Sequence, residues 1–140
     1  MKDINELENR YSIINKLRKI QNNLETYDRF IELSKQNPKN DVRATLTKID
    51  LLREEKANEI YTIVRSYGWL SERDIGHDLY QMVIRTLKFG TRETLQLFVP
   101  FLEKAAQMHR ISPEDYDLIM GYIENSKSGI LLKNRIKALK

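Results

Sequence analysis

The residues best suited to chemistry lie in one short stretch, SYGWLSERDIGHD at positions 66–78. It holds Trp69, the only Trp of the chain, and His77 with acidic residues on either side, Asp74 and Asp78. A histidine oriented by a carboxylate is a common general base, so one hypothesis is a hydrolase-like site with His77 as base. Asp74 can share a helix face with His77, three residues later, whereas the adjacent Asp78 cannot.

A structural role explains the same residues with fewer assumptions. Asp74 can place negative charge at a helix start, and His77 can be a partly exposed surface residue. Trp69 can fill a hydrophobic joint rather than stack on a ligand, and Gly68 and Gly76 permit turns. We therefore favour a packed joint between two helical parts and rank the enzyme hypothesis last.

The composition excludes several kinds of site. The 140 residues include two His and no Cys, which argues against disulfides, thiol nucleophiles and conventional zinc sites. Phosphate-binding glycine loops and the GxSxG and HExxH motifs are absent. The first residues are polar, and no run of about 20 apolar residues occurs. We expect a cytoplasmic protein with no membrane contact, no metal and no cofactor.

Apolar residues recur every three or four positions, which predicts an all-α fold of five to six helices. A helix from about residue 3 to 35 and another from about 42 to 66 should form a long antiparallel hairpin. A third is expected over about 74–89, with Gly90 as the residue after its end. Thr91 should cap the next helix, which Pro100 should kink or break.

The last clear helix signal is Ser112-Pro-Glu-Asp, which predicts a helix reaching about residue 124. The expected organisation is a hairpin (1–66), a compact multi-helix unit packed on it (67–126), and a basic C-terminal helix (127–140). We expect these parts to form one cooperative domain.

The first helix carries a heptad-like apolar stripe that includes Leu17, Leu24, Tyr27 and Ile31. Two long amphipathic helices alone provide little core for so long a stripe. The stripe therefore predicts a non-enzymatic protein–protein interaction module, which binds a protein partner or a second copy of the chain through the hairpin.

The basic excess of the chain belongs to its C-terminal segment. Of 24 basic and 20 acidic residues, residues 127–140 hold five basic and no acidic ones, so residues 1–126 have a net charge of −1. A basic amphipathic helix can bind nucleic acid or dock on the body of the protein. Nucleic-acid binding is thus the second hypothesis, and its contacts would be Lys133, Arg135, Lys137 and Lys140.

Residues 63–129 contain a series of short motifs: Gly68-Trp69-Leu70, Ile75-Gly76, Val99-Pro100-Phe101-Leu102 and Ser112-Pro113-Glu114-Asp115. Their order resembles a family of uncharacterised bacterial helical domains with Gly-Trp-Pro, Val-Gly, Gln-His-Ala-Asp and Pro-Leu-Leu motifs. The resemblance implies an all-helical unit and brings no activity with it. Leu70 replaces the family's Pro, and residues 88–91 read Lys-Phe-Gly-Thr in place of Gln-His-Ala-Asp.

Overall fold

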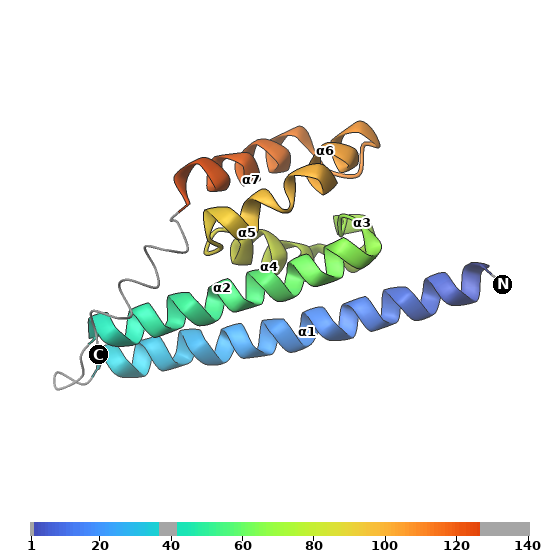
Figure 1. Cartoon of the computed structure of the whole chain (residues 1–140). Helices are drawn as coiled ribbons and strands as arrows, with labels where there is room; N and C mark the ends of the chain where they lie inside the picture. The colour runs from blue at the N-terminus through green and yellow to red at the C-terminus, as the bar shows by residue number, and fades with distance from the viewer. Residues whose placement is uncertain (1, 37–41, 127–140) are drawn as a thin grey trace.

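The computed structural model describes residues 2–36 and 42–126, with side chains at positions 9–33, 35–36 and 48–126. Helices follow one another along this part of the chain, and it contains no strand (Figure 1). The elements are α1 (Lys2–Lys35), α2 (Val42–Tyr67), α3 (Glu72–Ile75), α4 (His77–Leu87), α5 (Arg92–Gln96), α6 (Val99–Gln107) and α7 (Pro113–Asn125). The prediction of an all-α fold is confirmed, since the described part holds six helices and one four-residue helical turn, α3.

Helices α1 and α2 lie side by side as an antiparallel hairpin, and the shorter helices pack on one side of it (Figure 1). Helix α4 contacts both hairpin helices, and α5 contacts α2. Helices α6 and α7 pack on each other and lie farthest from α1. The N-terminal end of α1 extends beyond the other described helices.

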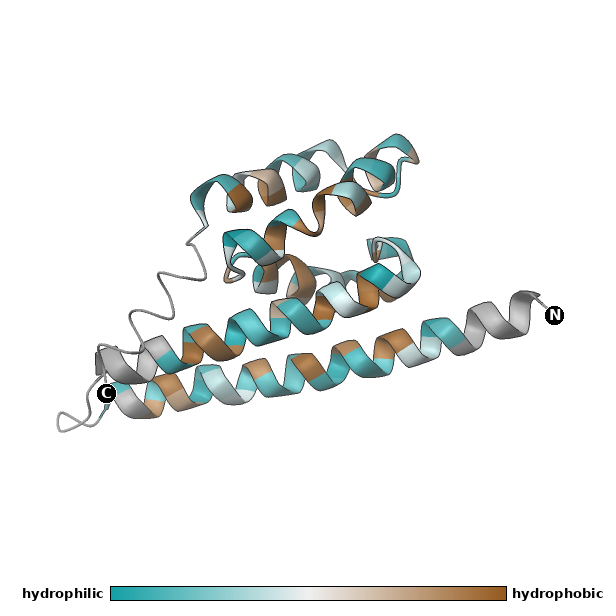
Figure 2. Cartoon of the chain, in the orientation of Figure 1, coloured by the Kyte–Doolittle hydropathy of each residue, from teal (hydrophilic) through white to brown (hydrophobic). Residues whose placement is uncertain are grey.

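One continuous hydrophobic cluster joins the hairpin to the shorter helices. Every helix from α1 to α7 except the short α3 contributes fully buried side chains to it, and these include Leu17, Ile60, Leu87, Leu95, Leu102 and Ile119. Figure 2 shows hydrophobic positions alternating with hydrophilic ones along α1 and α2, as expected for helices with one buried face. The expectation that these parts form one cooperative domain stays a prediction.

The helix starts of the second half follow the sequence signals closely. Ser112 Oγ accepts the backbone N–H of Asp115 at 3.1 Å, and Thr91 Oγ1 accepts that of Thr94 at 3.4 Å. Pro100 lies in the first turn of α6, where its missing N–H is harmless, so the chain breaks here instead of kinking. These N-caps confirm the predicted starts at both positions.

Two predictions about the third helix were wrong. The expected helix over 74–89 is divided at Gly76, whose φ of +88° ends α3 and precedes α4. Gly90 does not have the left-handed φ of a helix-ending glycine; a Cβ there would lie 2.9 Å from Leu95 Cδ2. Glycine is required at position 90 because the backbone lies close to the buried Leu95.

Candidate functional site

The joint at residues 66–78 is a packed junction. Trp69 is buried, and its ring meets the Tyr80 ring edge-to-face at a centroid distance of 6.3 Å. The indole Nε1 is buried without a hydrogen-bond partner of standard geometry among the described residues. Gly68, with φ of +85°, makes the turn out of α2 that brings Trp69 inward. The structural role expected for Trp69 agrees with this packing.

Asp74 is held by three donors from three parts of the chain. Its carboxylate accepts Ser71 Oγ at 2.8 Å, Arg110 at 2.7 Å and Arg10 at 3.3 Å. Burial alone would raise the pKa of this carboxyl. The hydrogen bonds from Ser71 and Arg110, with the charges of Arg110 and Arg10, outweigh burial and lower its pKa below the ordinary value. We call this group, Arg10, Ser71, Asp74 and Arg110, the Asp74 clamp.

His77 does not meet Asp74. Its Nδ1 lies 3.2 Å from a carboxylate oxygen of Glu72, and its side chain is 68% exposed. The carboxylate predicted to orient His77 is occupied by the clamp, and the histidine lies at the protein surface. The predicted pair of a His77 base oriented by Asp74 is therefore not formed.

A polar cleft of about 840 Å³ lies beside the clamp, between the α1 side chain Arg10, α3 and the α6–α7 connection. In its wall the Tyr80 hydroxyl donates to Asp115 at 2.9 Å. Burial, followed by this hydrogen bond and the Asp115 charge, raises the pKa of Tyr80 far above its ordinary value. The phenol therefore stays protonated at neutral pH and acts as a donor, which fits a structural link between α4 and α7.

His109, at the rim of the cleft, has a left-handed backbone with φ of +56°. The N–H of Arg110 bonds the carbonyl of Ala105 at 2.8 Å, and that of His109 bonds Ala106 at 3.2 Å. These two bonds define a Schellman ending of α6, with His109 where glycine is usual. Residue types do not predict this ending, because its usual marker, a glycine, is absent.

The apolar stripe predicted to bind a partner is largely used inside the chain. Leu17 and Ile31 are buried, and Leu24 is partly buried against the core. Tyr27 is half-buried. Neighbouring described helices cover most of this stripe and leave little of it for a partner, so partner binding through these four residues stays a prediction.

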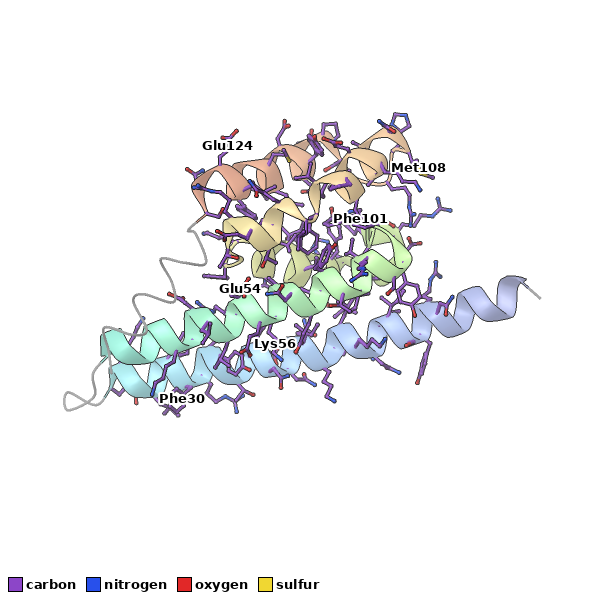
Figure 3. All side chains as sticks on the ribbon, in the orientation of Figure 1. Phe30, Glu54, Lys56, Phe101, Met108 and Glu124 are labelled. Carbon is purple, nitrogen blue, oxygen red and sulfur yellow. The ribbon has the colours of Figure 1, made fainter. Side chains whose placement is uncertain are left out.

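The opposite side of α1 has a second stripe that the sequence analysis missed. Stepping by four and three residues, the stripe consists of Tyr11, Asn15, Arg18, Asn22, Glu25, Arg29 and Leu33, all exposed. We call it the outer stripe. Its apolar ends, Tyr11 and Leu33, are 70% and 60% exposed. Beside it, Phe30 points away from the body of the protein (Figure 3).

The remaining candidates are not placed by the structure. Lys133, Arg135, Lys137 and Lys140 lie outside the described residues, so nucleic-acid binding through them stays a prediction. Among the described helices, none has the length and apolarity needed to cross a membrane. The described residues also include no group of three His, Asp or Glu side chains placed to hold a metal ion.

Comparisons with family models, curated proteins and solved structures found no significant match to this chain. The resemblance of residues 63–129 to a bacterial helical family therefore stays a prediction. The functional argument rests on the geometry of the chain itself.

Proposed function

We propose that this protein is a non-enzymatic interaction module that associates with a second copy of itself through the outer stripe of α1. The observation that carries the proposal is the arrangement of the stripe, whose apolar ends are placed symmetrically about Asn22. The predicted interaction through the hairpin is retained, and its surface moves from the covered inner face of α1 to the exposed outer face.

An antiparallel pair of α1 helices would satisfy this symmetry. If residue i of one copy lies opposite residue 44 − i of the other, Tyr11 faces Leu33 and Asn22 faces its own counterpart. Such an interface is isologous, as in most homodimers. At a rise of about 1.5 Å per residue, the stripe is about 33 Å long, so a pair would include several turns of each helix.

Charge supports the same pairing. Residues 9–24 contain four basic side chains and no acidic one, whereas residues 25–33 contain Glu25, Asp28 and Glu32 with one arginine, Arg29. Antiparallel pairing brings the basic segment of one copy against the acidic segment of the other. Arg18 would then lie opposite Thr26 and beside Glu25 of the second copy, and the two-fold axis at Asn22 repeats this contact. A parallel pair would place like charges together.

The test compares two leucine variants in sedimentation equilibrium. Wild-type protein is expected to be dimeric. Leu33→Asp should raise the dimer dissociation constant at least about tenfold, because it buries a charge in the interface. Leu118→Asp is the matched control, since Leu118 is an exposed leucine on α7, among the helices farthest from α1. A monomeric wild type, or equal effects of the two variants, would overturn the proposal.

A further inference from the structure

A groove of about 470 Å³ lies between α1 and α2, on the flank of the hairpin. Its floor includes two buried isoleucines, Ile20 and Ile63. Three lysines line it: Lys16 and Lys19 from α1 and Lys56 from α2. None of these lysines belongs to the outer stripe or to the Asp74 clamp. The volume is typical of sites for small organic ligands, about 300–1,000 Å³.

Lys56 is the most unusual residue of this groove. A lysine side chain is normally exposed to water, but that of Lys56 is only 10% exposed. It lies between α1 and α2 in Figure 3. Its Nζ donates to both carboxylate oxygens of Glu59, at 3.1 and 3.2 Å. A buried ammonium requires nearby negative charge, and Glu59 supplies one unit of it.

Among the described residues, the lining of the groove has an excess of positive charge. Neither Lys16 nor Lys19 forms an ion pair within the described part of the chain. With three ammonium groups and the carboxylate of Glu59, the lining has a net charge of +2. A phosphomonoester carries a charge of about −1.5 to −2 at neutral pH, which matches this excess. Lysine binds phosphate well as a compact point charge.

We propose that this groove binds a small phosphomonoester. The phosphate group would lie between the three lysines, and the organic group would contact the isoleucine floor and Tyr67, which also lines the groove. The combination of a charged rim and an apolar floor favours an ester over free phosphate, since the floor adds contact that inorganic phosphate cannot make. This proposal does not depend on self-association.

The experiment is a calorimetric titration with adenosine monophosphate, inorganic phosphate and adenosine as probes. Adenosine monophosphate should bind most tightly, inorganic phosphate should compete with it, and adenosine should bind at least about tenfold more weakly. Lys56→Met and the pair Lys16→Gln/Lys19→Gln should each raise the dissociation constant at least about tenfold. Lys104→Gln, an exposed lysine of α6, should leave it unchanged.

Several results would overturn the proposal. The first is the absence of any binding of adenosine monophosphate up to about 10 mM. The second is an affinity for adenosine equal to that for adenosine monophosphate. The third is a loss of affinity in Lys104→Gln as large as that in the groove variants. The proposal would also be overturned if a single-stranded oligonucleotide binds in a way that depends on the same lysines while adenosine monophosphate does not bind. That result would assign the groove to nucleic acid. Circular dichroism of each variant shows whether its helices remain formed.

Discussion

Helix α4 buries seven of its eleven side chains, whereas α1, with 34 residues, buries four of the side chains described within it. In α4 the buried residues face the hairpin on one side and the outer helices on the other. In α1 the other described helices cover only one face. The described side chains outside this face are mostly exposed, so packing among the described residues does not explain them.

This contrast separates residues that maintain the fold from residues available to a partner. Helices α4 to α7 contribute many apolar residues to the common core, and the N-capping residues Thr91 and Ser112 begin α5 and α7. The outer stripe of α1 instead has exposed apolar ends, and it lies on a helix whose residues 9–24 are basic and whose residues 25–33 are net acidic. Solubility alone does not require this arrangement of apolar and charged residues. We therefore assign the outer stripe to association with a second copy of the chain.

The largest expected effect concerns the inner face of α1. Leu17→Ala should lower the free energy of unfolding by about 2–5 kcal/mol, because a fully buried leucine leaves a cavity. Tyr11→Ala, on the outer face of the same helix, should change it by less than about 0.5 kcal/mol in monomeric protein. Urea denaturation followed by circular dichroism at low protein concentration measures both. If both variants lose a similar amount of unfolding free energy, the inner and outer faces of α1 do not differ in their contribution to stability.

A glycine pair tests the packing of the compact helices. Gly90→Ala should destabilise the protein by about 1–3 kcal/mol, because the new Cβ would lie 2.9 Å from the Leu95 side chain. Gly121→Ala in α7, where a Cβ meets nothing within 4 Å, should stabilise it by about 0.5–1 kcal/mol. Thermal unfolding distinguishes the two directions. If both variants are stabilised, the close approach at Gly90 is not a constraint.

The Asp74 clamp should give a smaller, pH-dependent effect. Asp74→Asn is expected to cost about 1 kcal/mol at neutral pH, a low value because the carboxylate is 35% exposed and screened by solvent. The folded-state pKa of Asp74 is lowered, so its stabilisation is present above the unfolded-state pKa of about 4 and disappears as pH falls through the lower value.

The stability difference between wild type and Asp74→Asn, measured by urea denaturation from pH 7 to pH 2, should therefore shrink on acidification. Asp117→Asn, at an exposed position of α7, is the control and should show little difference at any pH. A difference for Asp74→Asn that stays constant down to pH 2 would contradict the clamp.

The smallest effect is expected at the end of α6. His109→Gly should stabilise the protein by about 0.5–1 kcal/mol, because glycine adopts the left-handed conformation without a Cβ penalty. Differential scanning calorimetry should show a small rise in Tm. A fall in Tm would mean that the imidazole makes a contribution larger than the strain of its backbone.

Local signals in the sequence were sufficient for most of the fold. Helix bounds and the caps at Thr91 and Ser112 follow from residue type and spacing alone. Gly76 was expected to permit a turn, yet the helix predicted over 74–89 ran through it, because glycine is also tolerated within helices. His109 was missed for the related reason that a left-handed residue without glycine depends on its surroundings.

The candidate sites were less accessible to sequence reasoning because they depend on contacts between distant residues. Arg10 and Asp74 are 64 positions apart, and nothing in the local sequence connects them. The periodicity of Leu17 and Ile31 predicts a buried face without showing which helices cover it. The outer stripe carries only two apolar residues, so hydrophobic spacing does not reveal it, and only the charge division between residues 9–24 and 25–33 marks it.

The most direct measurement is a charge exchange within the outer stripe, analysed by sedimentation equilibrium. Arg18→Glu and Glu25→Arg should each raise the dimer dissociation constant at least about tenfold, since each places like charges together in both symmetry-related Arg18–Glu25 contacts. The double variant should restore dimerisation, and Lys104→Glu on α6 should have no effect. Failure of the double variant to restore it, or single variants as dimeric as wild type, would contradict antiparallel association through α1.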